Sequence, residues 1–224
     1  MIEITLATAL MGVVIAYAMS INTRGDDQGA GRNDADSLTS FANIAAEYYT
    51  ANRTAVDAAM QTGTGAATHC RLDVAADGTG GRTARSSTLK TCAFDSTLLR
   101  AKNLWPAGLS VDARDGRYVA IFRTVYDTQP TPAPTGGVEM LIALYSSNGV
   151  LSPATLDNRK TDELQAATSA MGGVGGYVPI GPMGACVARR STTIYEACGN
   201  GWKINLASFV DTTELTVFAN ALPN

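Results

Sequence analysis

Histidine is almost absent from this chain of 224 residues: His69 is the only one, and no G-x-S-x-G sequence surrounds any serine. Ser-His-Asp and Cys-His catalysis both need a histidine base, which leaves little room for either. His69 is predicted to be a solvent-facing loop residue. Asp112, Asp115 and Glu139 are alternative acid and base candidates near predicted strands, but nothing distinguishes them among the 20 acidic residues. The sequence therefore predicts no catalytic residue, no enzymatic activity and no cofactor.

Runs of lysine or arginine are also missing, and the formal net charge is -3. A nucleic-acid-binding protein is expected to carry a basic patch or stripe, so no direct nucleic-acid site is predicted. Charged residues make up only 17% of the chain, below the usual quarter or so. This deficit indicates that much of the surface contacts other protein; a bacterial secreted protein rich in Ala and Thr is the alternative with such a composition.

The four cysteines lack any C-x-x-C spacing, which argues against a zinc site, so no metal is predicted. An even count favours two disulfides in an oxidising compartment, with three possible connectivities; four free thiols in a cytosolic protein are the alternative. The sequential pairs are preferred because each closes a short segment rich in Gly, Ser and Thr. These pairs are Cys70 with Cys92 and Cys186 with Cys198.

The longest apolar run, Ile4 to Ile21, contains no charged residue and is just long enough to be a candidate membrane-spanning helix. A cleavable secretory signal is the alternative, with Ala16 to Ala18 as its cleavage site. That reading lacks the positively charged region that should precede the run, because only Met1, Ile2 and the acidic Glu3 stand there. An acidic residue at the tip of such a helix needs a partner, and the α-amino group of a neighbouring copy supplies one.

The segment MIEITLATALMGVVIAYA resembles the mature N-terminus of type IV pilins, with a leading Met typical of the type IVb class. The resemblance implies that a basic leader is removed, that the new N-terminus is methylated and that a nearby Glu guides docking onto the filament. Here the Glu is the third residue, whereas pilins usually carry it at the fifth. Met1 and Glu3 are thus the predicted docking residues. The predicted filament core comprises Ile4, Leu6, Leu10, Met11, Val13, Val14, Ile15 and Tyr17.

Three regions are expected: an apolar membrane or filament-core helix at 1–24, a flexible break at 25–33 and a globular head at 34–224. Gly25, Gly29 and Gly31 give the break its helix-weakening composition. Apolar residues spaced three and four apart then predict an amphipathic helix over 34–60.

The head is predicted to continue with an αβ-loop at 61–116, stapled by Cys70 and Cys92 and containing a short helix at 96–105. A sheet region follows at 117–224, with strands at 117–126 and 138–145. A further helix is expected at 161–171, before a glycine-rich turn at 172–177. Helices first and strands later indicate an α+β fold, in which a long N-terminal helix packs on an antiparallel sheet.

The resemblance implies the major pilin of a type IVb pilus, serving conjugation, adhesion or aggregation. Its partners would be identical subunits, the inner membrane before assembly and a pilus assembly machine. A minor pilin or tip adhesin is one alternative, and a membrane-tethered periplasmic enzyme or binding module is the other.

Overall fold

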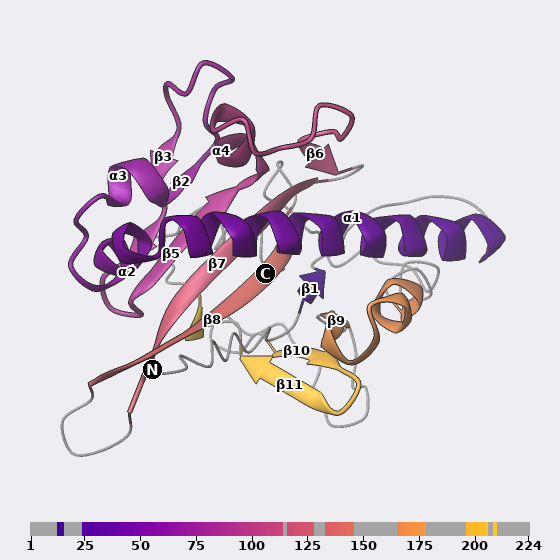
Figure 1. Cartoon of the computed structure of the whole chain (residues 1–224). Helices are drawn as coiled ribbons and strands as arrows, with labels where there is room; N and C mark the ends of the chain where they lie inside the picture. Colours follow the sequence, from indigo (N-terminus) through magenta and orange to yellow (C-terminus); the bar gives the residue numbers. More distant parts are fainter. Residues whose placement is uncertain are drawn as a thin grey trace, which may run out of the picture.

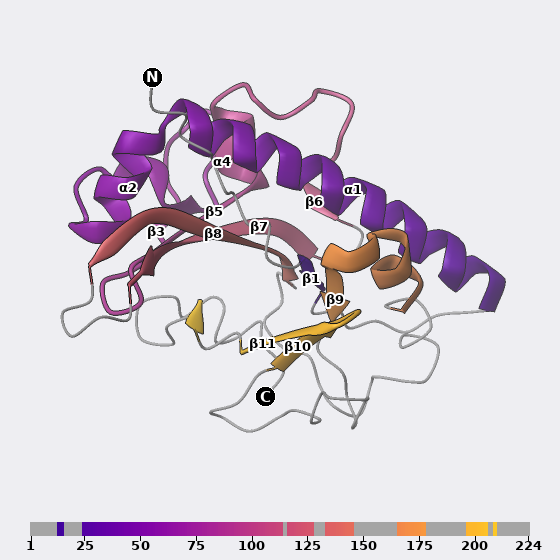
Figure 2. The same ribbon diagram turned by 60° about the horizontal axis from the view of Figure 1, so that its bottom comes forward.

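The computed structural model describes residues 13–15, 24–113, 116–127, 133–145, 165–177, 196–205 and 208–209. Its longest helix, α1 (Arg24–Ala51), lies along one face of a sheet (Figures 1 and 2). Helix α2 (Arg53–Gln61) continues directly after Asn52, and α3 (Ala66–His69) and α4 (Ser96–Ala101) follow. Residues 165–170 are also helical and lead into the 3-10 turn η2 (Gly172–Val174).

The sheet has nine strands in the described residues, in the order β11-β10-β9-β1-β8-β7-β5-β4, and β6 pairs with β7. The long central strands are β7 (Gly116–Tyr126) and β8 (Pro134–Tyr145), an antiparallel pair with Phe122 opposite Met140. The other strands of this sheet are short: β1 (Val13–Ile15), β4 (Arg85–Ser86), β5 (Thr91–Asp95), β6 (Asp112–Ala113), β9 (Gly175–Tyr177), β10 (Glu196–Gly199) and β11 (Trp202–Asn205). Strands β2 (Arg71–Leu72) and β3 (Arg82–Thr83) form a separate pair.

These elements confirm the predicted α+β class with a mainly antiparallel sheet. The strands predicted at 117–126 and 138–145 are the central β7 and β8. Both faces of this sheet centre are buried: Phe122 packs in the core beneath the helices, while the adjacent Ile121 is fully buried outside that cluster. Burial on both faces explains why these strands read as almost continuous apolar runs.

The core lies between α1 and the sheet. Leu38, Phe41, Ala45 and Tyr48 follow one another at helical spacing along α1, and all are at most 3% exposed. Below them, the Phe122 ring stacks on Tyr49 at 4.9 Å and on Phe94 at 5.4 Å between centroids. The aromatic residues of α1 therefore serve as core side chains.

The predicted flexible break at 25–33 is wrong for this structure, because α1 is helical from Arg24 onward without interruption (Figure 1). Each glycine costs about 1 kcal/mol in a helix relative to alanine. Packing offsets part of this cost, since the buried stripe of α1 already begins at Gly31 and continues through Ala35 and Leu38. The chain instead interrupts its helix at Asn52, inside the amphipathic helix predicted over 34–60.

Two further predictions need correction. The region 61–116 is more ordered than a loop, since it contains α3, α4 and five short strands. Val13–Ile15, predicted as part of the N-terminal helix, forms strand β1 parallel to β8 and β9. Two β-branched valines and isoleucine suit a strand, and pairing on both sides satisfies their backbone groups. The rest of the predicted N-terminal helix up to residue 23 lies outside the described residues.

Candidate assembly site

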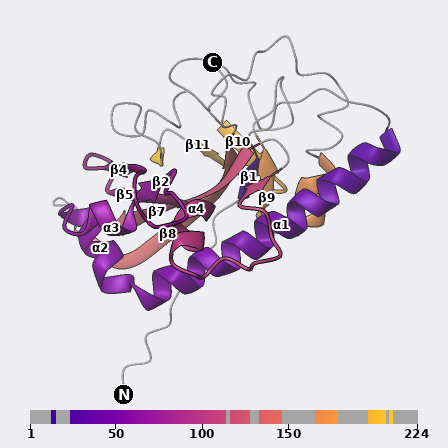
Figure 3. The same cartoon turned by 90° about the horizontal axis from the view of Figure 1, so that it is seen from above.

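Helix α1 has one buried and one polar face. Its outer side chains are short or charged, and the hydroxyls of Thr39, Ser40 and Thr50 donate hydrogen bonds of 2.8 to 2.9 Å to carbonyls one turn earlier. The exposed residues on this face include Arg32, Asn33, Asp36, Thr39, Ser40, Asn43, Glu47 and Thr50. At about 1.5 Å per residue the 28-residue helix is about 42 Å long. Its N-terminal end projects beyond the strands (Figures 1 and 3).

The predicted docking and filament-core residues lie mostly outside the described part of the chain. These are Met1, Glu3, Ile4, Leu6, Leu10, Met11 and Tyr17; Val13, Val14 and Ile15 are in β1. Gly25, Gly29 and Gly31 all lie within α1. Within the described ranges, none of the helices combines the length and the apolar character that crossing a bilayer demands. The docking and filament-core roles therefore stay predictions.

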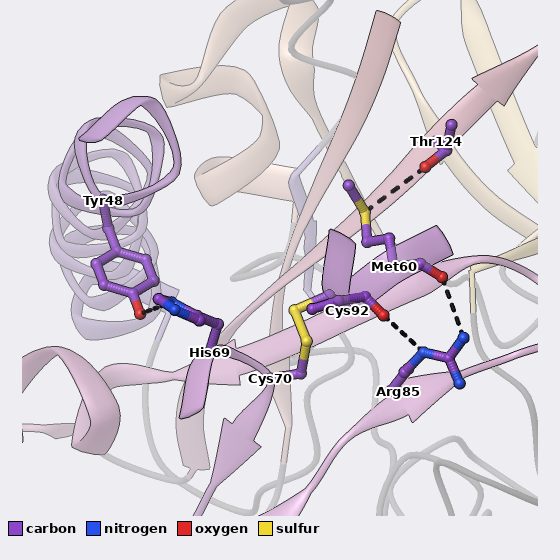
Figure 4. The surroundings of a disulfide bond; sticks show 8 residues. Tyr48, Met60, His69, Cys70, Arg85, Cys92 and Thr124 are labelled. Carbon is purple, nitrogen blue, oxygen red and sulfur yellow. Dashed lines mark hydrogen bonds between the residues drawn. A yellow bond between two sulfur atoms is a disulfide. The ribbon is translucent and has the colours of Figure 1, made fainter. Parts of the chain in front are cut away.

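The predicted disulfide between Cys70 and Cys92 is present and fully buried (Figure 4). It joins the residue after α3 to β5. Nearby, the Arg85 side chain donates from Nε to the carbonyl of Ala59 at 2.6 Å and from Nη2 to that of Met60 at 3.3 Å. A cation at the end of a helix also suits the helix dipole, so Arg85 fastens β4 to the end of α2.

The second predicted pair is only half described. Cys198, in β10, is disulfide-bonded, and there is no free cysteine in the described part of the chain. Its predicted partner Cys186 lies outside the described residues.

His69 is half-buried at the end of α3, which corrects the prediction of a solvent-facing loop residue. Its Nδ1 lies 2.8 Å from the Tyr48 hydroxyl, and Figure 4 shows the two side chains meeting beside the disulfide. Burial, helped by the charge of Lys102, lowers the pKa of His69, and burial raises the pKa of Tyr48 to about 12. Both groups are therefore neutral at pH 7, and their hydrogen bond ties α3 to α1.

The carboxylates considered as acid and base are engaged by arginines. Asp112 accepts a 2.8 Å hydrogen bond from Arg117, and Glu139 accepts one of 2.9 Å from Arg123. Asp115 lies outside the described residues. A carboxylate held by a guanidinium is a stabilising ion pair between neighbouring strands.

Asp95 is a buried carboxylate that the sequence reasoning missed. It caps α4 by accepting from the backbone N–H groups of Thr97 and Leu98, and its other oxygen accepts from Asp73 N–H at 2.9 Å. Arg117 lies 3.6 Å away. Burial raises the pKa of Asp95, while the hydrogen bonds and Arg117 oppose that rise. The signal was available, because an Asp directly before the predicted helix is a favoured N-cap.

The glycine-rich segment 172–177 has a packing explanation. The Trp202 indole covers β9 so closely that a Cβ on Gly176 would lie 2.4 Å from its ring, and its Nε1 donates to the carbonyl of Gly173 at 2.8 Å. Close approach of a large ring to backbone requires glycine.

Metal binding has no support in the described residues, where acidic, His and Cys side chains form no cluster of three that would hold an ion. Comparisons with protein-family models, with curated proteins and with solved structures found no match for this chain. The candidate assembly site comprises three parts: the apolar run Ile4 to Ile21, helix α1, and the region 61–116 that contains the Cys70–Cys92 disulfide.

Proposed function

We propose that this chain is the repeating structural subunit, the major pilin, of an extracellular filament of the type IVb pilus class. The observation that carries the proposal is the succession of two unlike segments. An uncharged run, Ile4 to Ile21, is followed within three residues by α1, whose inner face is built into an antiparallel head. The apolar run, which is too apolar to remain in water, therefore leads directly into α1, the longest helix of the folded head.

The proposed mechanism is physical. Before assembly the apolar run anchors the chain in the inner membrane as a helix, and in the filament the helices of many copies pack together. Both states require Val13–Ile15 to leave strand β1, where they pair with β8 and β9 in this structure. Burying one such helix removes about 1,000 Å² of apolar surface, or roughly 25 kcal/mol at 25 cal/mol per Å² before ordering costs. Much of this gain offsets extraction from lipid, where the run is already dehydrated, so assembly needs an energy-supplying machine.

Glu3 has a specific role in this mechanism. An ionised carboxylate in an apolar surrounding costs at least ~2.5 kcal/mol unless it is paired. The α-amino group of a neighbouring copy neutralises it and sets the depth at which a subunit docks. The heads then lie outside, and the polar outer face of α1 is compatible with contacts to other heads or to water.

The proposal is tested on cells that express the full chain together with a pilus assembly machine. Surface filaments are sheared, imaged by electron microscopy and separated by electrophoresis. This chain should be the dominant band, and a chain lacking residues 4–21 should yield no filaments. A trace amount of this chain in abundant filaments would instead favour a minor or tip subunit. Equal assembly of the truncated and intact chains would contradict the proposed role of the run.

A further inference from the structure

Strand β1 is a piece of the apolar run that lies within the sheet of the head. Val13–Ile15 pairs in parallel with residues 142–144 of β8 on one side and with Gly175–Tyr177 of β9 on the other (Figure 1). The run to which it belongs, Ile4 to Ile21, is the segment that the proposed function places in the membrane and in the filament core. The sheet and the proposed helical assembly therefore compete for the same three residues.

The local sequence suits an exchange between strand and helix. Val13, Val14 and Ile15 are the only three consecutive β-branched residues in the apolar run, and such residues favour extended backbone. Inside a bilayer the backbone of a single segment must satisfy its own hydrogen bonds, which requires a helix. A strand rises about 3.3 Å per residue and a helix about 1.5 Å, so β1 and a continuous helix through the run exclude each other.

Contacts other than β1 also hold the two halves of the sheet together. In the described sheet, β1 alone connects β8 to β9, and it pairs over only three residues. Away from β1, Arg123 of β7 donates to the carbonyl of Ser208 at 2.9 Å and lies over the Phe209 ring at 4.4 Å. Phe209 is fully buried, and Ala167, which precedes β9, belongs to the core between α1 and the sheet. The head therefore keeps these contacts when β1 leaves the sheet.

We propose that β1 is an autoinhibitory contact. Outside lipid and outside the filament, the head keeps Val13–Ile15 between β8 and β9, and a copy in this state neither inserts into a membrane nor polymerises. Release of β1 from the sheet is then the step that frees the run to become a helix. The inference rests on the proposed function for the helical states of the run, and it adds the contact that keeps free copies from associating early.

Engineered disulfides among three positions in one row across the sheet test this contact in the full chain. Val14 pairs with Ala143, and Ala143 pairs with Val119 of β7. Neighbouring strands lie about 4.8 Å apart, within disulfide reach, whereas two strands away is about 9.6 Å and out of reach. Val14→Cys with Ala143→Cys makes a β1–β8 link, and Val119→Cys with Ala143→Cys makes a β7–β8 link within the head. Val14→Cys with Val119→Cys should form no link.

The purified full chain is oxidised mildly, and the links are identified by mass spectrometry. In buffer the β1–β8 link should form as readily as the β7–β8 link. Addition of phosphatidylcholine vesicles before oxidation should slow the β1–β8 link roughly ten-fold or more and leave the β7–β8 link unchanged, because insertion empties the sheet-bound state. The chain locked by the β1–β8 link should not float with vesicles, whereas the chain with the β7–β8 link should float like the unaltered chain.

The outcomes separate the two proposals. A β1–β8 link that forms no faster than crosslinks between Val14→Cys and Val119→Cys would overturn the autoinhibitory contact, as would normal flotation of the locked chain. Assembly of the locked chain into abundant filaments would also overturn it and leave the filament function standing. If the locked chain behaves as expected but the unaltered chain forms no filaments, the proposed function fails and β1 controls membrane insertion alone.

Discussion

At the scale of single residues, several polar side chains of the head bond to specific partners. His69 meets Tyr48, Asp95 caps α4, and Arg117 bonds to Asp73 at 2.5 Å as well as to Asp112. The His69–Tyr48 and Arg117–Asp73 contacts join segments that are distant in sequence, whereas the Asp95 cap and the Arg117–Asp112 pair are local. Their loss should therefore lower the stability of the head.

His69 should make the stability of the head depend on pH. Its pKa is lower in the folded chain than its ordinary value of 6.5, so below that pH the unfolded chain binds the extra proton more readily. The free energy of unfolding should then fall as pH drops from about 6.5 toward the lowered pKa. Because His69 is the only histidine, His69→Gln should flatten the change in Tm between pH 7.5 and 5.5.

Tyr48→Phe is the control for this prediction. It removes the hydrogen bond and should cost about 1 kcal/mol at every pH, but burial of His69 and hence the pH dependence should remain. An unchanged pH dependence in His69→Gln would contradict the account.

Asp95→Ala should lower the free energy of unfolding by about 2 kcal/mol, measured by urea denaturation. The substitution removes the α4 cap and leaves the Asp73 N–H without its acceptor. Asp77→Ala is the matched control, because Asp77 is exposed and bonds only within its own turn to Thr79. Equal losses in the free energy of unfolding from the two substitutions would mean that the buried cap stabilises the head no more than an exposed turn does.

At the scale of elements, the head consists of α1 packed on the sheet and of the disulfide-linked region 61–116 beside it. Hydrophobic periodicity predicted the packed part of α1, and the apolar runs predicted β7 and β8. The break predicted from composition at 25–33 was wrong, because three glycines lower the helix propensity but do not reveal the packing that begins at Gly31. The loop predicted at 61–116 was also wrong in part. Its two-residue strands are stabilised by a disulfide and by Arg85, and such contacts leave no periodic pattern in the sequence.

Gly29→Ala tests whether α1 is continuous at its N-terminal end. A Cβ at this position would meet nothing within 4 Å, so the gain in helix propensity should appear in full. Stability should rise by up to about 1 kcal/mol in thermal or urea unfolding. Gly176→Ala is the contrasting variant and should destabilise, because its Cβ would clash with Trp202. A loss of stability in Gly29→Ala would favour a break in the helix there.

The Cys70–Cys92 disulfide should stabilise the head mainly by restricting the unfolded chain. The cysteines are 22 residues apart, and on the loop-entropy model such a crosslink contributes about 3 kcal/mol. The double variant Cys70→Ala with Cys92→Ala should show this loss in urea denaturation. Only a negligible change would mean that Arg85 and the Tyr48–His69 contact already hold the segment.

At the scale of the whole molecule, the α+β class and the central strands followed from the order of sequence patterns. The contacts of Asp95 with Asp73 and of Trp202 with Gly173 did not follow from these patterns, because they join residues that only folding brings together. The predicted assembly residues, Met1 and Glu3 among them, lie outside the described residues, so the step from head to filament rests on the apolar run and on its position before α1.

The filament yield of a Leu10→Lys variant tests this central claim most directly. If the run is helical in the membrane and in the filament, as proposed, a lysine near its centre costs about 2.5 to 3.5 kcal/mol, so filaments recovered by shearing and sedimentation should fall by roughly 100-fold or more. Asn43→Lys places the same charge on the exposed face of α1 and should leave the yield within about two-fold of the unaltered chain. Equal yields from the two variants would contradict the proposal that the apolar run is the core of a polymer.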